Sequence, residues 1–75
     1  QIKGLEVIIV IENSVRRERK ALGLTLIDLA SRSGVSKSTI SEIEHGLVDP
    51  MLGTAFQLSI AMDCSIYDIF SYREN

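Results

Sequence analysis

Apolar residues recur at helical spacing along most of this chain, most clearly near the middle of the sequence. Ile40 and Ile43 lie three positions apart, so they fall on one side of a helix. Ser36 is a good N-cap for that helix, and Val35 before it can pack against Ile40 as a hydrophobic staple. The pattern predicts a short helix over residues 36–45.

The other side of this helix is polar and carries Lys37, Ser38, Ser41 and Glu42. Side chains of these types can hydrogen-bond the base edges in the major groove of DNA. A preceding helix is predicted over residues 25–33, and only Gly34 and Val35 separate it from the cap of the next one. A short turn containing glycine between two short helices is typical of the helix-turn-helix unit. We therefore interpret the helix over residues 36–45 as a recognition helix.

Caps and glycines predict where the first two helices begin and end. A helix over residues 12–22 is expected to stop at Gly23, which can adopt the left-handed conformation. Thr25 is the expected N-cap of the helix over residues 25–33, and Asp28 stands at its N3 position, as in a capping box.

Two more helices are predicted in the last third of the chain. Asp49 is the expected N-cap of the fourth, with Pro50 at its first position. The inner face of this helix is predicted to carry Leu52, Ala55, Leu58, Ser59 and Met62. Ser65 is expected to cap a short fifth helix that has Asp68 at N3. Residues 72–75 are expected to fray.

Residues 1–11 form an apolar N-terminal segment that has a different pattern. Positions 7–11 are five β-branched residues in a row, which favours an extended strand. A helix remains open, because Ile8, Ile11 and Val15 also lie at helical spacing. The segment has more apolar surface than a small helical domain can cover, which is an argument for self-association. The alternative is an ordinary flank of the core.

Composition limits the class of protein. The chain has 75 residues and 45% hydrophobic residues, enough for one small domain with a core. Its single cysteine, Cys64, excludes an internal disulfide, and together with a single histidine it excludes a Cys/His zinc site. A reduced, cytoplasmic setting fits best. No apolar run approaches the ~20 residues needed to span a bilayer, so no membrane association is expected.

The charges are unevenly distributed along the chain. The formal net charge of −2 is unfavourable for binding DNA phosphates. However, residues 16–37 carry six lysines and arginines against two acids, a net +4, whereas the rest of the chain carries two against eight, a net −6. A run of charge is most often a solvated helix face, so this pattern alone is weak evidence for DNA binding.

Residues 16–70 resemble the phage repressor and Cro type of helix-turn-helix regulators, the XRE family. The matching pattern comprises Arg19, Leu22-Gly23-Leu24-Thr25, Leu29-Ala30, Gly34-Val35-Ser36, Thr39-Ile40-Ser41, Ile43-Glu44-His45-Gly46, Pro50 and Ser65-Ile66-Tyr67-Asp68-Ile69-Phe70. The resemblance implies an all-α, five-helix, lambda-repressor-like domain over residues 12–71, with the helix-turn-helix unit at about residues 25–45. An N-terminal strand or helix extension over residues 1–11 would be an addition to it.

The resemblance also implies roles for individual residues. Arg19 and Glu44 match a structural ion pair of the family; the alternative is that both are plain surface charges. The positions expected to face base edges are Lys37, Ser38, Ser41 and Glu42. Those expected to contact the DNA backbone are Arg16, Arg17, Lys20, Arg32, Ser36 and Thr39.

Two departures from the family pattern lower the expected affinity for DNA. Leu26 stands where the family usually has a glutamine that contacts phosphate, and the loop over residues 47–49 lacks the usual basic residues. Affinity per subunit should therefore be modest, and two half-sites bound by a homodimer would compensate. Candidate dimer-interface residues are Val7, Ile9, Phe56 and Ile60.

These observations favour a homodimeric, sequence-specific transcriptional regulator that binds double-stranded DNA at a two-fold-symmetric operator. The alternative is a protein-interaction module of the same fold, an antitoxin-like or anti-repressor subunit with a protein partner. An enzyme is not expected, because His45 is better explained as a cap or phosphate contact, and neither paired carboxylates nor a phosphate-binding loop appears. No cofactor or metal is expected.

Overall fold

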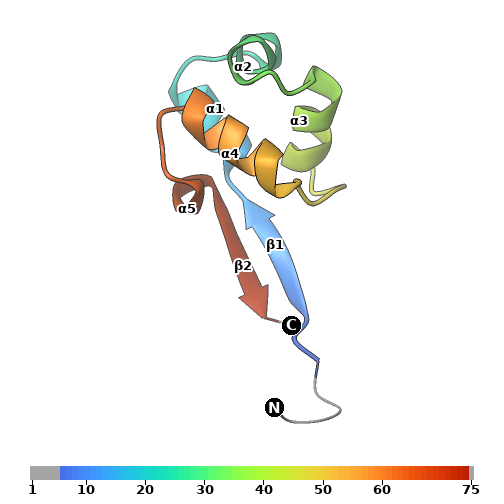
Figure 1. Cartoon of the computed structure of the whole chain (residues 1–75). Helices are drawn as coiled ribbons and strands as arrows, with labels where there is room; N and C mark the ends of the chain where they lie inside the picture. Colours follow the sequence, from blue (N-terminus) through green and yellow to red (C-terminus); the bar gives the residue numbers. More distant parts are fainter. Residues whose placement is uncertain (1–5, 75) are drawn as a thin grey trace.

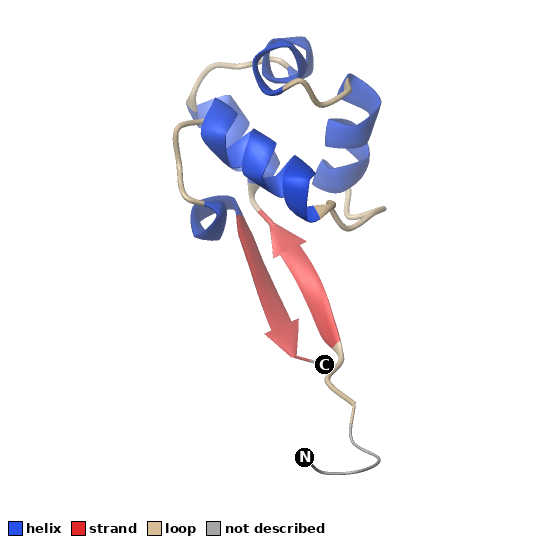
Figure 2. Cartoon of the chain, viewed as in Figure 1, coloured by secondary structure: helices blue, strands red, loops and turns tan. Residues whose placement is uncertain are grey.

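The computed structural model describes residues 6–74, so the first five residues of the apolar N-terminal segment, and residue 75, lie outside the described part. The elements are, in order, β1 (Ile9–Asn13), α1 (Val15–Ala21), α2 (Leu26–Ser33), α3 (Lys37–Glu44), α4 (Leu52–Ala61), α5 (Ile66–Ile69) and β2 (Phe70–Glu74). The helices gather at one end, and the two strands extend from them as a ribbon (Figure 1; Figure 2).

Every helix contributes to one core. The largest fully buried side chains are Val15 of α1, Leu29 of α2, Ile40 and Ile43 of α3, Leu58 of α4 and Ile69 of α5. Burying a side chain of this size stabilises the fold by roughly 1.5–3 kcal/mol. The five-helix prediction is confirmed, and the core holds α3 in place through two isoleucines.

The predicted caps are present at α2, α3 and α5. Thr25 and Asp28 form a capping box at α2, and Ser65 and Asp68 form another at α5. At α3, the Ser36 hydroxyl accepts a hydrogen bond from the Thr39 amide at 3.1 Å. Such bonds satisfy amides in the first turn that have no partner within the helix.

The predicted start of the fourth helix is wrong. The N-cap of α4 is Met51, which has extended backbone angles and makes no side-chain cap, so Asp49 and Pro50 lie in the preceding loop. Asp49 and Pro50 are residue types that suit a cap and a first helical position, but the backbone is still extended at Met51, so the first turn begins only at Leu52. Leu52, predicted to face inward, is 71% exposed, whereas the rest of the predicted inner face is buried: Ala55, Leu58, Ser59 and Met62.

The chain termini form a sheet, and this corrects two expectations. Residues 9–13 are a strand, so the helical alternative for this segment is wrong and the first helix begins at Val15, later than the predicted residue 12. Residues 70–74, of which the last few were expected to fray, pair antiparallel with β1, from Ile9 opposite Glu74 to Asn13 opposite Phe70. The helical core brings the two termini together, since the Ser14 amide donates to the Ile69 carbonyl at 2.9 Å.

Candidate nucleic-acid interface

The turn between α2 and α3 presents the outer face of α3 to solvent. Gly34 ends α2 with φ +75°, a left-handed conformation that other residues adopt only with strain. Ile40 and Ile43, which are 0% and 1% exposed, pack against the core. The opposite face of α3 is therefore directed away from the domain, as the two-sided pattern predicts. Its residues are Lys37, Ser38, Ser41 and Glu42.

The four predicted base-contacting residues come together in one shallow hollow. Lys37, Ser38 and Glu42 are exposed and Ser41 is partly exposed. All four line a hollow whose remaining wall is Leu26 of α2. The hollow thus offers a cation, two hydroxyls, a carboxylate and one apolar side chain to a ligand.

Leu26 also borders this hollow, and its apolar side chain was not among the residues predicted to contact DNA. It is partly buried against the core, and its remaining surface faces the polar side chains of α3. The apolar spacing identifies Leu26 correctly as a residue of the α2 stripe. The crossing of α2 and α3 places it beside the four polar residues of α3.

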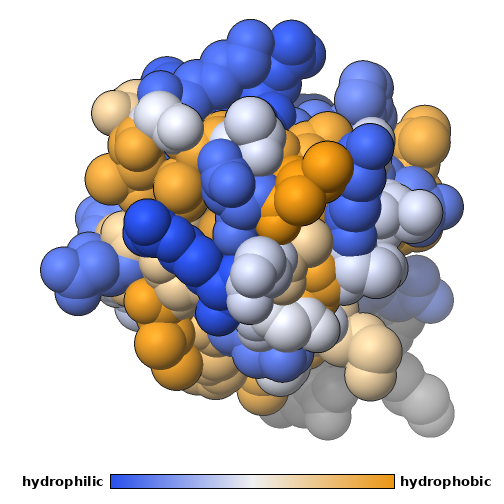
Figure 3. Space-filling view, turned by 90° about the horizontal axis from the view of Figure 1, so that it is seen from above, coloured by the Kyte–Doolittle hydropathy of each residue, from blue (hydrophilic) through white to orange (hydrophobic). Residues whose placement is uncertain are grey.

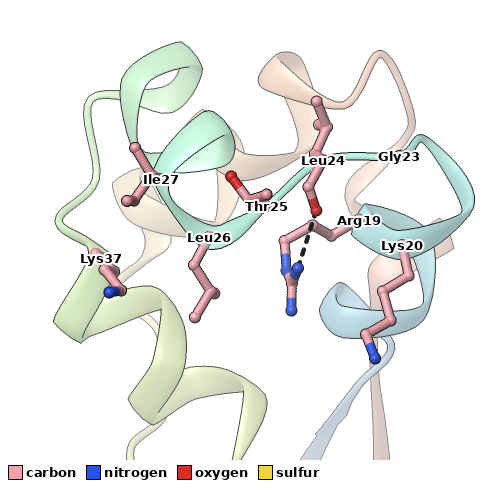
Figure 4. Close-up of a pocket in the computed structure, with 8 residues that line it drawn as sticks. All are labelled: Arg19, Lys20, Gly23, Leu24, Thr25, Leu26, Ile27 and Lys37. Atoms are coloured by element: carbon pink, nitrogen blue, oxygen red, sulfur yellow. Dashed lines mark hydrogen bonds between the residues drawn. The ribbon is translucent and has the colours of Figure 1, made fainter.

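A second hollow lies where α1, the start of α2 and the start of α3 approach one another (Figure 4). Its residues are Arg19, Lys20, Gly23, Leu24, Thr25, Leu26, Ile27 and Lys37. In Figure 4, Leu26 lies between Lys37 on one side and Arg19 and Lys20 on the other. Two exposed lysines, Lys20 and Lys37, therefore lie on either side of the apolar side chain.

The other predicted backbone-contacting residues are divided between two places. Arg16, Arg17 and Lys20 share a hollow beside the start of α1, and all three are exposed. Arg32 is exposed in the last turn of α2 and does not line this hollow.

Ser36 and Thr39 bond to each other. The Ser36 hydroxyl donates to Thr39 Oγ1 at 2.8 Å while accepting the Thr39 amide. A phosphate could accept a hydrogen bond from Ser36 only if that hydroxyl gave up its bond to Thr39 Oγ1, whereas the Thr39 hydroxyl still has a proton to donate.

The end of α3 is tied to α1 by a buried ion pair. Arg19 Nε donates to Glu44 Oε2 at 2.8 Å and Arg19 Nη2 donates to Glu44 Oε1 at 3.0 Å. The two side chains are only 8% and 3% exposed, which excludes the alternative of plain surface charges. Arg19 Nη1 also donates to the Leu24 carbonyl at 2.9 Å. The hydrogen bond with Glu44 raises the pKa of Arg19, against the opposing effect of burial.

Two neighbouring contacts complete the attachment of α3. Asn13 Nδ2 donates to the Ile43 carbonyl at 2.9 Å, which ties the end of β1 to the helix. His45 is the C-cap residue, and its Nδ1 lies 2.7 Å from the Ser41 carbonyl oxygen. His45 therefore acts as a local cap.

Comparison with protein families identifies this architecture. A helix-turn-helix family model, HTH_3, matches residues 15–69, which includes all five helices. The chain belongs to the XRE/Cro-C1 type of helix-turn-helix transcriptional regulators. The resemblance inferred from the residues is confirmed, and so is the absence of an enzymatic role, since this is a family of DNA-binding regulators.

Two archaeal regulators of similar length are related to this helix-turn-helix protein. An HTH-type transcriptional regulator of Methanocaldococcus jannaschii is 39% identical over 64 residues, covering 85% of this chain and 97% of the relative. Another from Methanothermobacter thermautotrophicus is 40% identical over 62 residues, covering 81% of this chain and 90% of the relative.

Solved structures show the same fold. The restriction-modification controller protein C.AhdI of Aeromonas hydrophila superposes with a TM-score of 0.70 at 30% identity, covering 72% of this chain and 82% of that one. An HTH_3 family transcriptional regulator of Vibrio cholerae superposes with a TM-score of 0.67 at 31% identity, covering 69% of this chain and 29% of that one. The lambda-repressor-like helical architecture is therefore confirmed, with the small sheet of the termini added to it.

Residues 6–74 hold no group of three or more His, Cys, Asp or Glu side chains placed to bind a metal ion. None of the helices described in this part of the chain is long and apolar enough to cross a membrane.

Proposed function

We propose that this regulator binds a two-fold-symmetric operator as a homodimer and contacts base edges through α3. The observation that supports this proposal is the accessible polar face of α3, formed by Lys37, Ser38, Ser41 and Glu42 around one hollow. Lysine can donate to guanine O6 and N7, serine can donate or accept, and glutamate can accept from cytosine N4. In the cell, such a regulator would act in the cytoplasm.

The surface that supports dimerisation lies on α4, α5 and the ribbon. Phe56 and Ile60 are one turn apart on α4 and are 48% and 75% exposed. Phe56 also lines an apolar groove whose other residues are Ile11, Leu52, Ile66, Tyr67, Phe70, Ser71 and Tyr72. A contiguous apolar surface of this kind commonly marks a protein interface.

The ribbon extends this groove with one of its faces. Strand side chains alternate, and Ile11 stands opposite Tyr72, so Ile9, Ile11 and Tyr72 share one face. The other face carries the exposed pair Arg73 and Glu12, whose atoms Nε and Oε2 are 3.7 Å apart. Ile9, 45% exposed, lies on the same face beyond the groove, opposite Glu74, and Val7, 84% exposed, lies just before β1. An isolated two-stranded sheet is marginal in water, so burial of its apolar face by a second copy would stabilise it.

Selection of bound duplexes from a random pool tests the operator proposal. A preferred sequence with two half-sites about one helical turn apart, bound by two protomers in sedimentation, is the expected result. Affinity should fall steeply with salt. Binding without any preferred sequence at moderate salt would contradict the proposal.

A protein-interaction role is the second candidate, and the loop after α3 supports it. Leu47 and Val48 are 72% and 42% exposed where basic residues are usual in the family. The net charge of −2 also disfavours a purely DNA-directed function. Capture of a stoichiometric protein partner, together with no electrophoretic shift of any duplex in the random pool, would favour this candidate.

A further inference from the structure

Leu26 is the one apolar side chain in the hollow formed by the candidate base-contacting residues. It occupies the first position of α2, and the other residues of the hollow are Lys37, Ser38, Ser41 and Glu42. Part of Leu26 packs against the core, which fixes its position, and part remains accessible. Leu26 cannot form hydrogen bonds through its side chain, so it can contribute to binding only by contacting an apolar group of the ligand.

The surrounding charges indicate what kind of ligand reaches Leu26. Lys20 and Lys37 line the second hollow together with Leu26 and flank it (Figure 4). Two flanking cations suit a DNA strand whose phosphates lie on either side of the leucine. The ligand atoms between those phosphates belong to a sugar or to a base edge, and in the major groove the apolar base group is the thymine C5-methyl.

We propose that Leu26 contacts a thymine methyl in each half-site and is a specificity-determining residue. The inference rests on the proposed function, because it requires α3 to lie in the major groove. It adds a base preference set by α2, beside those set by α3. A sugar contact is the lesser alternative because every nucleotide has a sugar, whereas Leu26 shares its hollow with the side chains that face the bases.

Replacement of thymine by deoxyuridine tests this contact, because the change removes only the methyl group. Each thymine of the selected half-site is replaced in turn, and the dissociation constant is measured by fluorescence anisotropy. Loss of one buried methyl is expected to weaken binding about four-fold per half-site at one position. The dissociation constant of the deoxyuridine duplex is divided by that of the thymine duplex. In the Leu26→Ala and Leu26→Gln variants, this ratio should fall from about four to about one at that position.

The ratio is measured within each variant, so a general change in affinity or stability does not affect it. Leu26→Gln keeps a side chain of similar size and guards against loss of folding in Leu26→Ala. Ile27→Ala is the matched control: Ile27 is the next residue of α2, 65% exposed, and lines only the second hollow. The ratio should keep its four-fold value in Ile27→Ala.

Three results would overturn the inference while leaving operator binding intact. They are a selected half-site without thymine, a wild-type protein indifferent to every deoxyuridine replacement, and a four-fold ratio that persists in both Leu26 variants. Absence of any preferred operator would instead contradict the proposed function itself, and the inference would fall with it.

Discussion

The side of the molecule formed by α2 and α3 and the side formed by α4, α5 and the ribbon differ in what they expose. On α3, the isoleucines are buried and the exposed residues are polar. On α4, Phe56 and Ile60 are exposed although the same helix buries Leu58. Seen from the end that carries α2, hydrophilic side chains and apolar patches are mixed on the surface (Figure 3). One side is suited to a hydrated polyanion and the other to an apolar partner.

This contrast also teaches that the two sides depend on the core in different ways. The position of α3 depends on a buried ion pair and two buried isoleucines, so damage there should affect stability and DNA binding together. Ile60 of α4, 75% exposed, makes few contacts within one protomer, so a change there should affect assembly more than stability.

The largest expected effect comes from breaking the buried ion pair. Arg19→Met leaves the Glu44 carboxylate, 3% exposed, without its cation and removes the bond to the Leu24 carbonyl. The free energy of unfolding should fall by roughly 3–5 kcal/mol, because an unpaired buried charge is costly. Urea denaturation followed by circular dichroism measures this change.

The double variant Arg19→Met/Glu44→Leu should recover most of that loss, since no charge is left buried. Arg73→Met is the matched control, because it breaks the pair with Glu12, in which both side chains are over half exposed. Its cost should stay below about 1 kcal/mol. Equal losses in Arg19→Met and Arg73→Met would show that burial does not distinguish the two pairs.

The next largest effect concerns the apolar side. Ile60→Asp places a charge on the surface of α4, where Ile60 is 75% exposed. The proposed dimer should weaken by about 100-fold or more, because a carboxylate is costly to bury without a partner. Sedimentation equilibrium measures the dissociation constant, and circular dichroism should show an unchanged fold.

Ile27→Asp is the same substitution on the opposite side, at an isoleucine of α2 that is 65% exposed. Its dimer dissociation constant should match that of the wild-type protein. If both aspartates weaken the dimer equally, or neither does, the proposed division between the two sides is wrong.

A smaller effect is expected for Lys37, on the polar side. Lys37→Ala should weaken operator binding by about 5- to 150-fold if the lysine contacts a base. If it contacts only phosphate, all sequences should weaken alike and the salt dependence should drop by about one charge. Anisotropy titrations at several salt concentrations separate these results. Arg73→Ala removes one positive charge from the ribbon and should leave binding nearly unchanged.

The smallest effect concerns the cap of α2. Hydrogen bonds from the Thr25 amide and hydroxyl lower the pKa of the exposed Asp28 carboxyl below its ordinary value of 3.8. A lowered folded-state pKa means that this stabilisation is present above about pH 4 and is lost as pH falls through the folded-state pKa. The Asp28→Asn variant should therefore have a slightly lower free energy of unfolding than the wild type near neutral pH. This gap in the free energy of unfolding should narrow below pH 4.

Urea denaturation at several pH values measures that gap. Asp49→Asn, at an exposed carboxylate in the loop before α4, is the matched control for the loss of one surface charge. A gap that is independent of pH would mean that the Asp28 charge does not contribute through the cap.

Helix starts could be predicted where the information is local. The capping boxes at Thr25 and Ser65 join residues three positions apart, so the sequence alone contains both partners. The predicted start of α4 was wrong although its local signal was clear. Asp49 and Pro50 have the right types for a cap and first position, but the loop continues to Met51 before the helix begins.

The candidate site was predictable only in part. Lys37, Ser38, Ser41 and Glu42 follow from the periodicity of one helix, which determines which residues share a face. Leu26 belongs to a different helix, so its place beside them depends on how α2 crosses α3. The bond between Ser36 and Thr39, which changes what Ser36 can offer to a phosphate, depends on side-chain conformation.

The sequence by itself determined the five helices, the glycines that follow α1, α2 and α3, and the two-sided character of α3, because these depend on contacts within a few residues. Only the tertiary structure decided that the termini form a sheet and that Arg19 and Glu44 are buried together. Strand pairing between Ile11 and Tyr72 requires that the core first bring distant segments of the chain side by side. No local pattern contains that information, because the partner of each strand lies about sixty residues away in the sequence.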